Sequence, residues 1–80
     1  MTTVKFEYNK QSFTVKYENQ EDSWELIELS DGSCVDTNLY EDVEGLHNIA
    51  IHPIRDTNEG YTETVTETTL DVIREVEILD

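Results

Sequence analysis

The sequence predicts a small β-rich single domain: an antiparallel sheet of about five or six strands that starts with a hairpin and holds at most one or two short helices. Three observations predict this class. Apolar and polar residues alternate near the N-terminus, β-branched residues are dense near the C-terminus, and turn-forming residues separate the segments. The 80 residues suffice for one domain, spanning 1–80, and leave no room for a second.

The first two segments of the chain predict a β-hairpin. Residues 3–8 and 12–17 alternate strictly between apolar and polar side chains, which is typical of strands with one buried face. Their connection, Asn9-Lys10-Gln11, is short enough for a tight turn, and Asn readily adopts a positive φ. All three lysines belong to this hairpin. We expect the two on its polar face to pair with acids from elsewhere in the fold: Lys5 and Lys16.

The middle of the chain is expected to form a second hairpin. Residues 23–29 fit a strand, and they also fit a short helix capped by Asp22 with Glu25 in its first turn. The next four residues, Ser30-Asp31-Gly32-Ser33, favour the hairpin because Asp-Gly suits a type I′ turn. The segment Cys34-Val35 is then the return strand.

Two further segments lead into the C-terminal part. Residues 36–45 are acidic and fit one short helical turn that Gly45 would end. Residues 46–54 form the most apolar section, and their isoleucines favour a strand. Because proline cannot donate to a ladder, Pro53 is expected to mark the end of this strand or an edge of the sheet.

The last twenty residues leave two interpretations open. Their β-branched density favours strands over 61–69 and 70–79, which is the interpretation we adopt. The spacing of Thr64 and Glu67 also matches a capping box, and several apolar residues after it recur at helical spacing. A helix within residues 61–79 therefore remains the alternative.

The chain is strongly acidic, with 19 Asp and Glu against 5 Lys and Arg and a formal net charge of −14. No Lys or Arg occurs between Tyr17 and Ile54, a stretch that holds ten of the acids. Charge of this size repels nucleic acid and anionic membranes and attracts basic surfaces. We therefore expect neither direct nucleic-acid binding nor membrane binding, and a basic protein as partner.

The cysteine content and the N-terminus predict a cytoplasmic protein. The single cysteine, Cys34, cannot form an internal disulfide, which favours a reducing compartment. The first residues lack the apolar core of a signal peptide, and no apolar run is long enough to span a membrane. For a chain encoded by a virus, the compartment would be the host cytoplasm.

No catalytic or metal-binding signature is found in the sequence. Nothing near Cys34 would lower its pKa and activate it as a nucleophile. His47 and His52 have opposite parity, so on one strand they would point to opposite faces and could not share an ion. The acids from Asp56 to Glu67 resemble a Ca²⁺ loop in type, but a glycine is missing at the required sixth position. We expect no enzyme activity, no catalytic residues, no metal and no cofactor.

Two groups of residues are candidates for partner binding. In the first, acids recur at every fourth position and would concentrate negative charge on one surface: Glu59, Glu63, Glu67, Asp71 and Glu75. In the second, acids flank an aromatic residue that is expected to be exposed: Tyr40, Glu41, Asp42 and Glu44. Either group could present carboxylates where a basic groove expects phosphates. The acidity is also consistent with an ordinary solvated face that maintains solubility, and with adaptation to a high-salt cytoplasm.

The sequence therefore predicts a non-enzymatic acidic binding protein. Its most specific form is an inhibitor, of the kind that viruses and mobile elements encode, which docks on a nucleic-acid-binding protein by mimicking the charge of a polyanion. The alternative is a small structural or assembly subunit that pairs with a neighbouring chain through its β-rich C-terminal segment. Homodimerisation is a further option, because a chain of this length has a small margin of stability.

Overall fold

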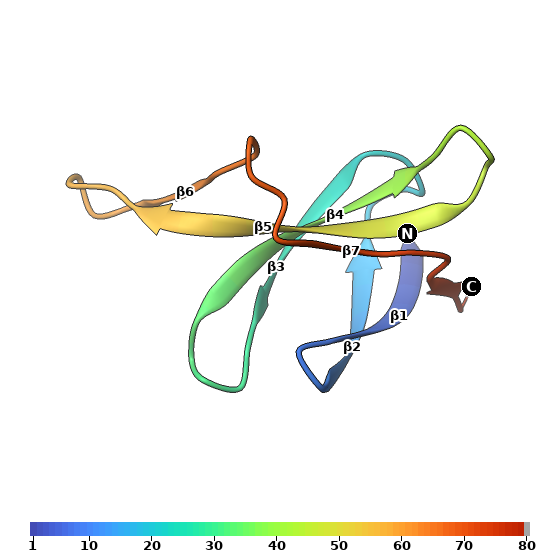
Figure 1. Ribbon diagram of the computed structural model, residues 1–80, viewed down its shortest axis with the longest axis horizontal. Coiled ribbons are helices and arrows are strands. Elements are labelled where there is room, and N and C mark those ends of the chain that lie inside the picture. Colours follow the sequence, from blue (N-terminus) through green and yellow to red (C-terminus); the bar gives the residue numbers. More distant parts are fainter. Residues whose placement is uncertain (80) are drawn as a thin grey trace.

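Eight β-strands make up the regular structure of residues 1–79, the part of the chain that the computed structural model describes, and no helix occurs among them (Figure 1). The strands are β1 (Thr2–Tyr8), β2 (Gln11–Tyr17), β3 (Ser23–Glu28), β4 (Cys34–Glu41), β5 (His47–Asp56), β6 (Thr62–Thr64), β7 (Asp71–Ile73) and β8 (Glu77–Ile78). They form a three-stranded sheet, β2-β1-β8, and a five-stranded sheet, β3-β4-β5-β6 with β7 also paired to β5. Every pairing is antiparallel, so the predicted β-rich fold class is confirmed.

The predicted N-terminal hairpin is present as β1 and β2. Asn9 and Lys10 both have positive φ, at 54° and 62°, as a two-residue type I′ turn requires. Of the two lysines expected to pair with acids, Lys5 lies across from Glu77 of β8, but neither lysine forms an ion pair within residues 1–79. Lys16 instead lies across from Thr3.

Three of the later connections share one design, a five-residue turn with glycine in fourth place. In each five-residue turn, the first N–H donates to the carbonyl of the fifth residue, and the glycine N–H in fourth place donates to the carbonyl of the first. The turns are Leu29–Ser33, Asp42–Leu46 and Thr57–Tyr61, with φ of 90°, 83° and 87° at Gly32, Gly45 and Gly60. This is a three-residue hairpin loop with a glycine bulge.

Two local predictions are corrected by these turns. The segment Asp31-Gly32 does not form a type I′ turn, because only Gly32 has a positive φ. Residues 36–45 do not form a helical turn: β4 continues through Glu41, and the return is confined to the glycine-bulge turn that follows. The β-branched and aromatic residues of this segment pair along β3 and β5, which stabilises the strand over a local helix.

β5 continues past Pro53 to Asp56, so the expectation that Pro53 ends the strand or lies on an edge is wrong. The Pro53 carbonyl accepts a hydrogen bond from Val65 N–H at 2.9 Å, and the next bond toward β7 runs from Leu70 N–H to the Ile51 carbonyl at 2.8 Å. Between these two bonds the chain leaves the ladder over residues 66–69. Because Pro53 has no N–H, it offers no donor to the segment beside it, and the strand partner bulges away at that point.

The C-terminal segment joins the two sheets. It forms three short strands rather than the two longer ones expected over 61–69 and 70–79, and the helical alternative is not found. Val76 N–H donates to the His47 carbonyl of the five-stranded sheet at 3.0 Å, and Leu79 N–H donates to the Thr3 carbonyl of the three-stranded sheet at 2.9 Å. The chain changes sheets at Glu75, whose φ is 52°.

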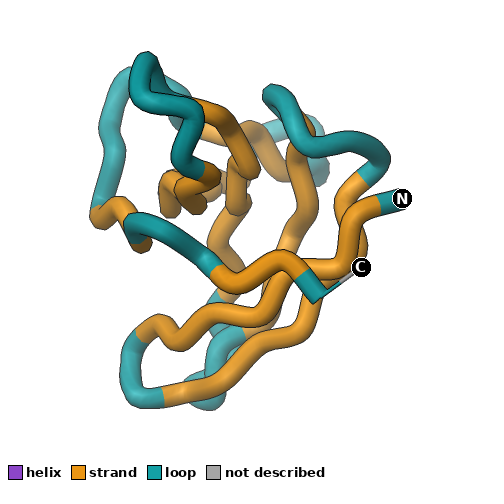
Figure 2. The backbone as a smooth tube through the Cα atoms, turned by 90° about the vertical axis from the view of Figure 1, so that its right-hand side faces the viewer, coloured by secondary structure: helices purple, strands orange, loops and turns teal. Residues whose placement is uncertain are grey.

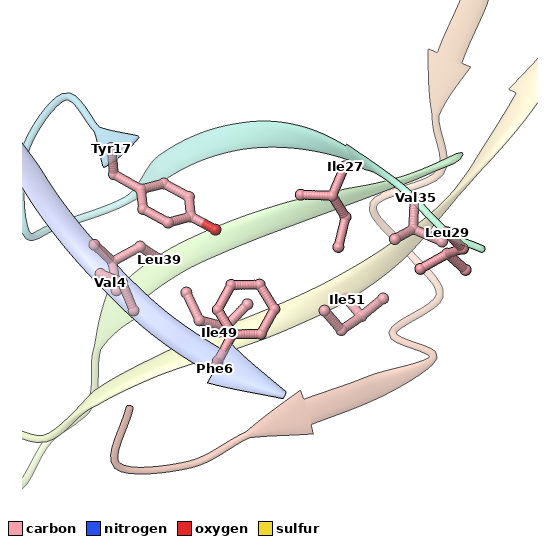
Figure 3. Close-up of a cluster of buried hydrophobic side chains, with 9 residues drawn as sticks. All are labelled: Val4, Phe6, Tyr17, Ile27, Leu29, Val35, Leu39, Ile49 and Ile51. Atoms are coloured by element: carbon pink, nitrogen blue, oxygen red, sulfur yellow. The ribbon is translucent and has the colours of Figure 1, made fainter. Parts of the chain in front are cut away.

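Figure 2 shows the backbone of the strands, and the hydrophobic core lies between the two sheets that these strands form (Figure 3). Its buried members are Val4, Phe6, Tyr17, Ile27, Leu29, Val35, Leu39, Ile49 and Ile51. Strand alternation in β3 directs Ile27 into this core and leaves Trp24 and Leu26 on the outer face, 37% and 57% exposed. The outer face of β3 is therefore both apolar and accessible.

Candidate binding surfaces

The first candidate group follows the edge of β5 that β6 and β7 cover. Its acids are all exposed, and they occupy five different settings: Glu59 in the β5–β6 turn, Glu63 in β6, Glu67 in the bulge, Asp71 in β7 and Glu75 at the change of sheet. Since residues 61–79 form neither one strand nor one helix, these carboxylates do not make a regular ladder. They surround the C-terminal segment at irregular spacing.

Among residues 1–79, Arg55 and Glu63 form the only ion pair, with Arg55 Nη2 and Glu63 Oε2 3.0 Å apart and both side chains more than half exposed. Their positions follow from the β5–β6 register, which places the two residues opposite each other. An exposed pair of this kind contributes little to stability, about 0–1 kcal/mol. Glu63 is thus less available to a partner than the other acids of its group.

The second candidate group lies at an open hollow of about 360 Å³. Three of its members line the hollow, Tyr40, Glu41 and Asp42, and the structure adds two acids that sequence reasoning missed, Glu21 and Asp22. Pairing of Ser23 with Leu39 brings the β2–β3 loop beside the end of β4. Tyr40 is half-buried rather than exposed. Glu44 is exposed in the neighbouring turn and does not line the hollow.

Two buried asparagines orient the aspartates of the hollow. Asn38, 9% exposed, donates from Nδ2 to Asp22 Oδ1 at 3.2 Å. Asn48, 1% exposed, donates from Nδ2 to Asp42 Oδ2 at 2.9 Å. Because these hydrogen bonds already fix the aspartate side chains, the side chains lose less conformational entropy when a partner binds.

Asp42 is the most constrained acid of the hollow. Besides the bond from Asn48, its Oδ1 accepts hydrogen bonds from the backbone N–H groups of Glu44 at 2.9 Å and Leu46 at 3.0 Å. These bonds, led by the Asn48 side chain and assisted by the nearby Arg74 charge, hold the pKa of the Asp42 carboxyl below its ordinary value. Asp42 therefore shapes the turn as well as contributing charge to the hollow.

Asn48 also connects the two candidate groups. Its Oδ1 accepts a hydrogen bond from Glu75 N–H at 3.0 Å, so a single buried side chain ties the acidic hollow to the change of sheet. The spacing of residues along the sequence gave no sign of this link, since the two contacts of Asn48 depend on the path of the C-terminal segment.

The carboxylates are uncompensated over most of the molecule. None of those in residues 1–79 is buried, and only Glu25, Asp36 and Asp42 are half-buried. The three lysines all lie on the β1–β2 hairpin, and none of them lines the hollow. A surface of this kind produces a negative potential that reaches about 8–10 Å into physiological salt.

The described residues show no group of three or more His, Cys, Asp or Glu placed to hold a metal ion. His52 is buried, its ring lies 5.0 Å from the Trp24 ring, and its Nδ1 has no hydrogen-bond partner. The free Cys34 is exposed.

Among residues 1–79, no helix is long and apolar enough to cross a membrane. No family model, curated protein or solved structure matches the chain.

Proposed function

We propose that this chain is a non-enzymatic binding protein that docks its acidic surface on a basic, nucleic-acid-binding protein in the cytoplasm. Docking would inhibit the partner, because carboxylates would occupy the positions of phosphates. The observation that carries the proposal is the exposure of the carboxylates, of which one in residues 1–79 is engaged in an ion pair. A charge that the fold does not neutralise is available to a partner.

The two candidate groups would act at different ranges. The acids around the C-terminal segment contribute long-range attraction, which raises the rate of encounter without fixing a geometry. The hollow contributes the contact, because a lysine or arginine side chain that enters it meets the carboxylates of Glu21 and Glu41 and the ring of Tyr40. Attraction between a cation and an aromatic face adds about 0.5–2 kcal/mol to such a contact.

Inhibition of this type suits the products of viruses and mobile elements. A mimic of polyanion charge blocks many proteins that have a nucleic-acid groove, since every such groove is basic. The cytoplasm is where we place this activity, including the host cytoplasm for a viral product.

Displacement of nucleic acid tests the proposal directly. Fluorescein-labelled duplex DNA is bound to a sequence-independent DNA-binding protein with a basic groove, and the acidic chain is titrated in while anisotropy is recorded. We expect the DNA to be released, with an affinity that weakens steeply as salt rises. Release that is absent at low salt would contradict the proposal. A stable, salt-indifferent oligomer in light scattering would support the assembly alternative instead.

Two single variants separate a defined contact from net charge. Glu41→Lys alters the hollow, and Glu7→Lys is its matched control, because both residues are exposed glutamates near the end of a strand that leads into a hairpin turn. Each changes the net charge equally. We expect Glu41→Lys to weaken displacement about tenfold more than Glu7→Lys does. Equal effects would mean that charge acts without the hollow.

A further inference from the structure

We propose that the free edge of β3 receives an extended, basic segment of the partner as an added strand. This inference rests on the proposed function and specifies how the partner is held. In strand addition, backbone hydrogen bonds supply affinity, and side chains at alternate positions supply specificity. Three features support strand addition at β3: its backbone, its side chains, and the contrasting charge of the β2 edge.

No strand of the described chain pairs with the outer edge of β3, although side-chain hydrogen bonds close its two ends: Glu18 N–H donates to the Ser23 hydroxyl at 3.1 Å, and Ser30 N–H donates to Gln11 Oε1 at 2.9 Å. β3 is the last strand of the five-stranded sheet, and within residues 1–79 no backbone hydrogen bond joins it to β2. Leu29 N–H donates to the Ser33 carbonyl at 2.7 Å, which fixes the phase of the β3–β4 ladder. Hydrogen-bonded pairs alternate in an antiparallel ladder, so three residues direct their N–H and C=O groups away from β4: Trp24, Leu26 and Glu28.

The side chains of these three residues select a basic occupant. All three lie on the outer face of the sheet and are accessible to solvent. On an added strand, a lysine at one of the alternate positions would meet the Glu28 carboxylate. The exposed part of Trp24, whose ring lies 5.0 Å from that of His52, and Leu26 would contact the aliphatic stems of neighbouring lysines. The start of β3 leads directly to Asp22 and the acidic hollow, so the charge complementarity continues beyond the strand.

β2 is likewise an edge strand, and its edge has the opposite charge. β2 is the last strand of the three-stranded sheet, and it carries Lys16, follows directly on Lys10 and contains no acid. A basic strand would be repelled there. The outward-facing residue that corresponds to Leu26 is Thr14, because the tight turn at Asn9-Lys10 makes Tyr8 and Gln11 a hydrogen-bonded pair. The two edges thus form a matched pair for the experiment.

The probe is a blocked eight-residue peptide in which lysine and valine alternate, compared with a peptide of the same composition in which four lysines precede four valines. Proline at an outward-facing edge position keeps the ladder to the neighbouring strand and removes the donor that an added strand needs. We therefore compare Leu26→Pro with Thr14→Pro. We expect Leu26→Pro to weaken binding of the alternating peptide by about tenfold or more, and Thr14→Pro by less than about twofold.

Amide hydrogen exchange of the unaltered protein provides a readout that does not depend on the folding of a variant. We expect the alternating peptide to slow exchange at the backbone N–H groups of Trp24, Leu26 and Glu28, and to leave those of Ser12 and Thr14 unchanged. If the N–H groups of Trp24, Leu26 and Glu28 already exchange slowly without any peptide, a second copy of the chain would be the occupant, and the proposal would be overturned.

The remaining outcomes distinguish this inference from the proposed function. Equal binding of both peptides, without protection of β3, would overturn strand addition and leave acidic docking intact. Loss of binding in Thr14→Pro but not in Leu26→Pro would overturn it as well. If neither peptide binds, strand addition is rejected. The proposed function is then tested independently by the DNA displacement assay.

Discussion

Asn48 shows how one buried residue positions two charged loops. Its amide donates to Asp42 and accepts from Glu75 N–H, and the side chain is almost inaccessible to water. Both partners lie where the backbone has a positive φ: Asp42 is the first residue of the turn that contains Gly45, and Glu75 itself has a positive φ. Such turns need an anchor, because a short strand or a bulge alone does not fix their direction. Asn48 is that anchor for the hollow and for the change of sheet.

Replacing Asn48 with leucine, which has a similar size, should destabilise the fold. The Glu75 N–H would lose its partner in a half-buried setting, and we expect a loss of about 2–3 kcal/mol in the free energy of unfolding. Asn58→Leu is the control, since Asn58 is exposed in a loop, and its effect should stay within about 0.5 kcal/mol. Urea unfolding followed by tryptophan fluorescence measures both. Equal effects of the two substitutions would show that Asn48 is not an anchor.

At the scale of elements, a buried chain of hydroxyl groups joins the two sheets. Thr37 Oγ1 donates to the Glu25 carbonyl at 2.7 Å, so its only proton is used. The hydrogen bond of 2.6 Å between Tyr17 and Thr37 must therefore be donated by the Tyr17 hydroxyl. These two hydrogen bonds connect the end of β2, where Tyr17 points into the core (Figure 3), to β4 and β3. Burial raises the pKa of Tyr17 to about 12.

Tyr17→Phe should reveal this contact through its dependence on pH. At neutral pH we expect the variant to lose about 1 kcal/mol of stability, the typical contribution of a buried hydrogen bond. In the unfolded chain the hydroxyl ionises near its ordinary pKa of 10, whereas the folded protein resists ionisation until about 12. A raised acid pKa favours the unfolded state as pH increases, so the advantage of the natural protein should shrink between pH 10 and 12. The control Tyr61→Phe, at an exposed position, should show neither effect in urea titrations.

Local chemistry explains which elements the sequence could predict. The first hairpin depends on alternation and on a two-residue turn, and both are visible within residues 3–17. β5 instead continues through Pro53 because the segment beside it, distant in sequence, bulges away at that point. Local rules take a proline as the end of a strand and contain no information about this bulge. The change of sheet at Glu75 is likewise invisible, because positive φ is rare for glutamate and is imposed here by tertiary contacts.

The candidate site shows the same division. Tyr40, Glu41 and Asp42 are adjacent in sequence, so their acidity and aromatic character could be recognised together. Glu21 and Asp22 reach the hollow through the register between β3 and β4, a contact between distant parts of the chain. A short stretch of sequence does not reveal the register between two strands. Glu21 and Asp22 could therefore not be recognised from the sequence as members of the hollow.

At the scale of the whole molecule, the net negative charge lowers the stability of the folded protein. Carboxylates on one small surface repel one another, and the ion pairs needed to offset this repulsion are scarce among residues 1–79. The same repulsion is the source of the field that attracts a basic partner. Stability and binding should therefore respond to salt in opposite directions.

Added salt should stabilise the protein. We expect the melting temperature to rise steadily from about 20 mM to 500 mM NaCl, because screening weakens repulsion between exposed charges. A variant in which Glu63, Glu67 and Asp71 are replaced by their amides should show a smaller rise. Differential scanning calorimetry checks both. A chain that is unfolded at the lowest salt would instead indicate adaptation to a high-salt cytoplasm.

The association rate with a basic protein is the measurement that tests the central claim most directly. Stopped-flow fluorescence gives the association and dissociation rate constants as functions of ionic strength. If uncompensated carboxylates steer docking, the association rate constant falls at least about tenfold between roughly 20 and 200 mM salt, while the dissociation rate constant changes much less. An association rate constant that is indifferent to salt would contradict the account.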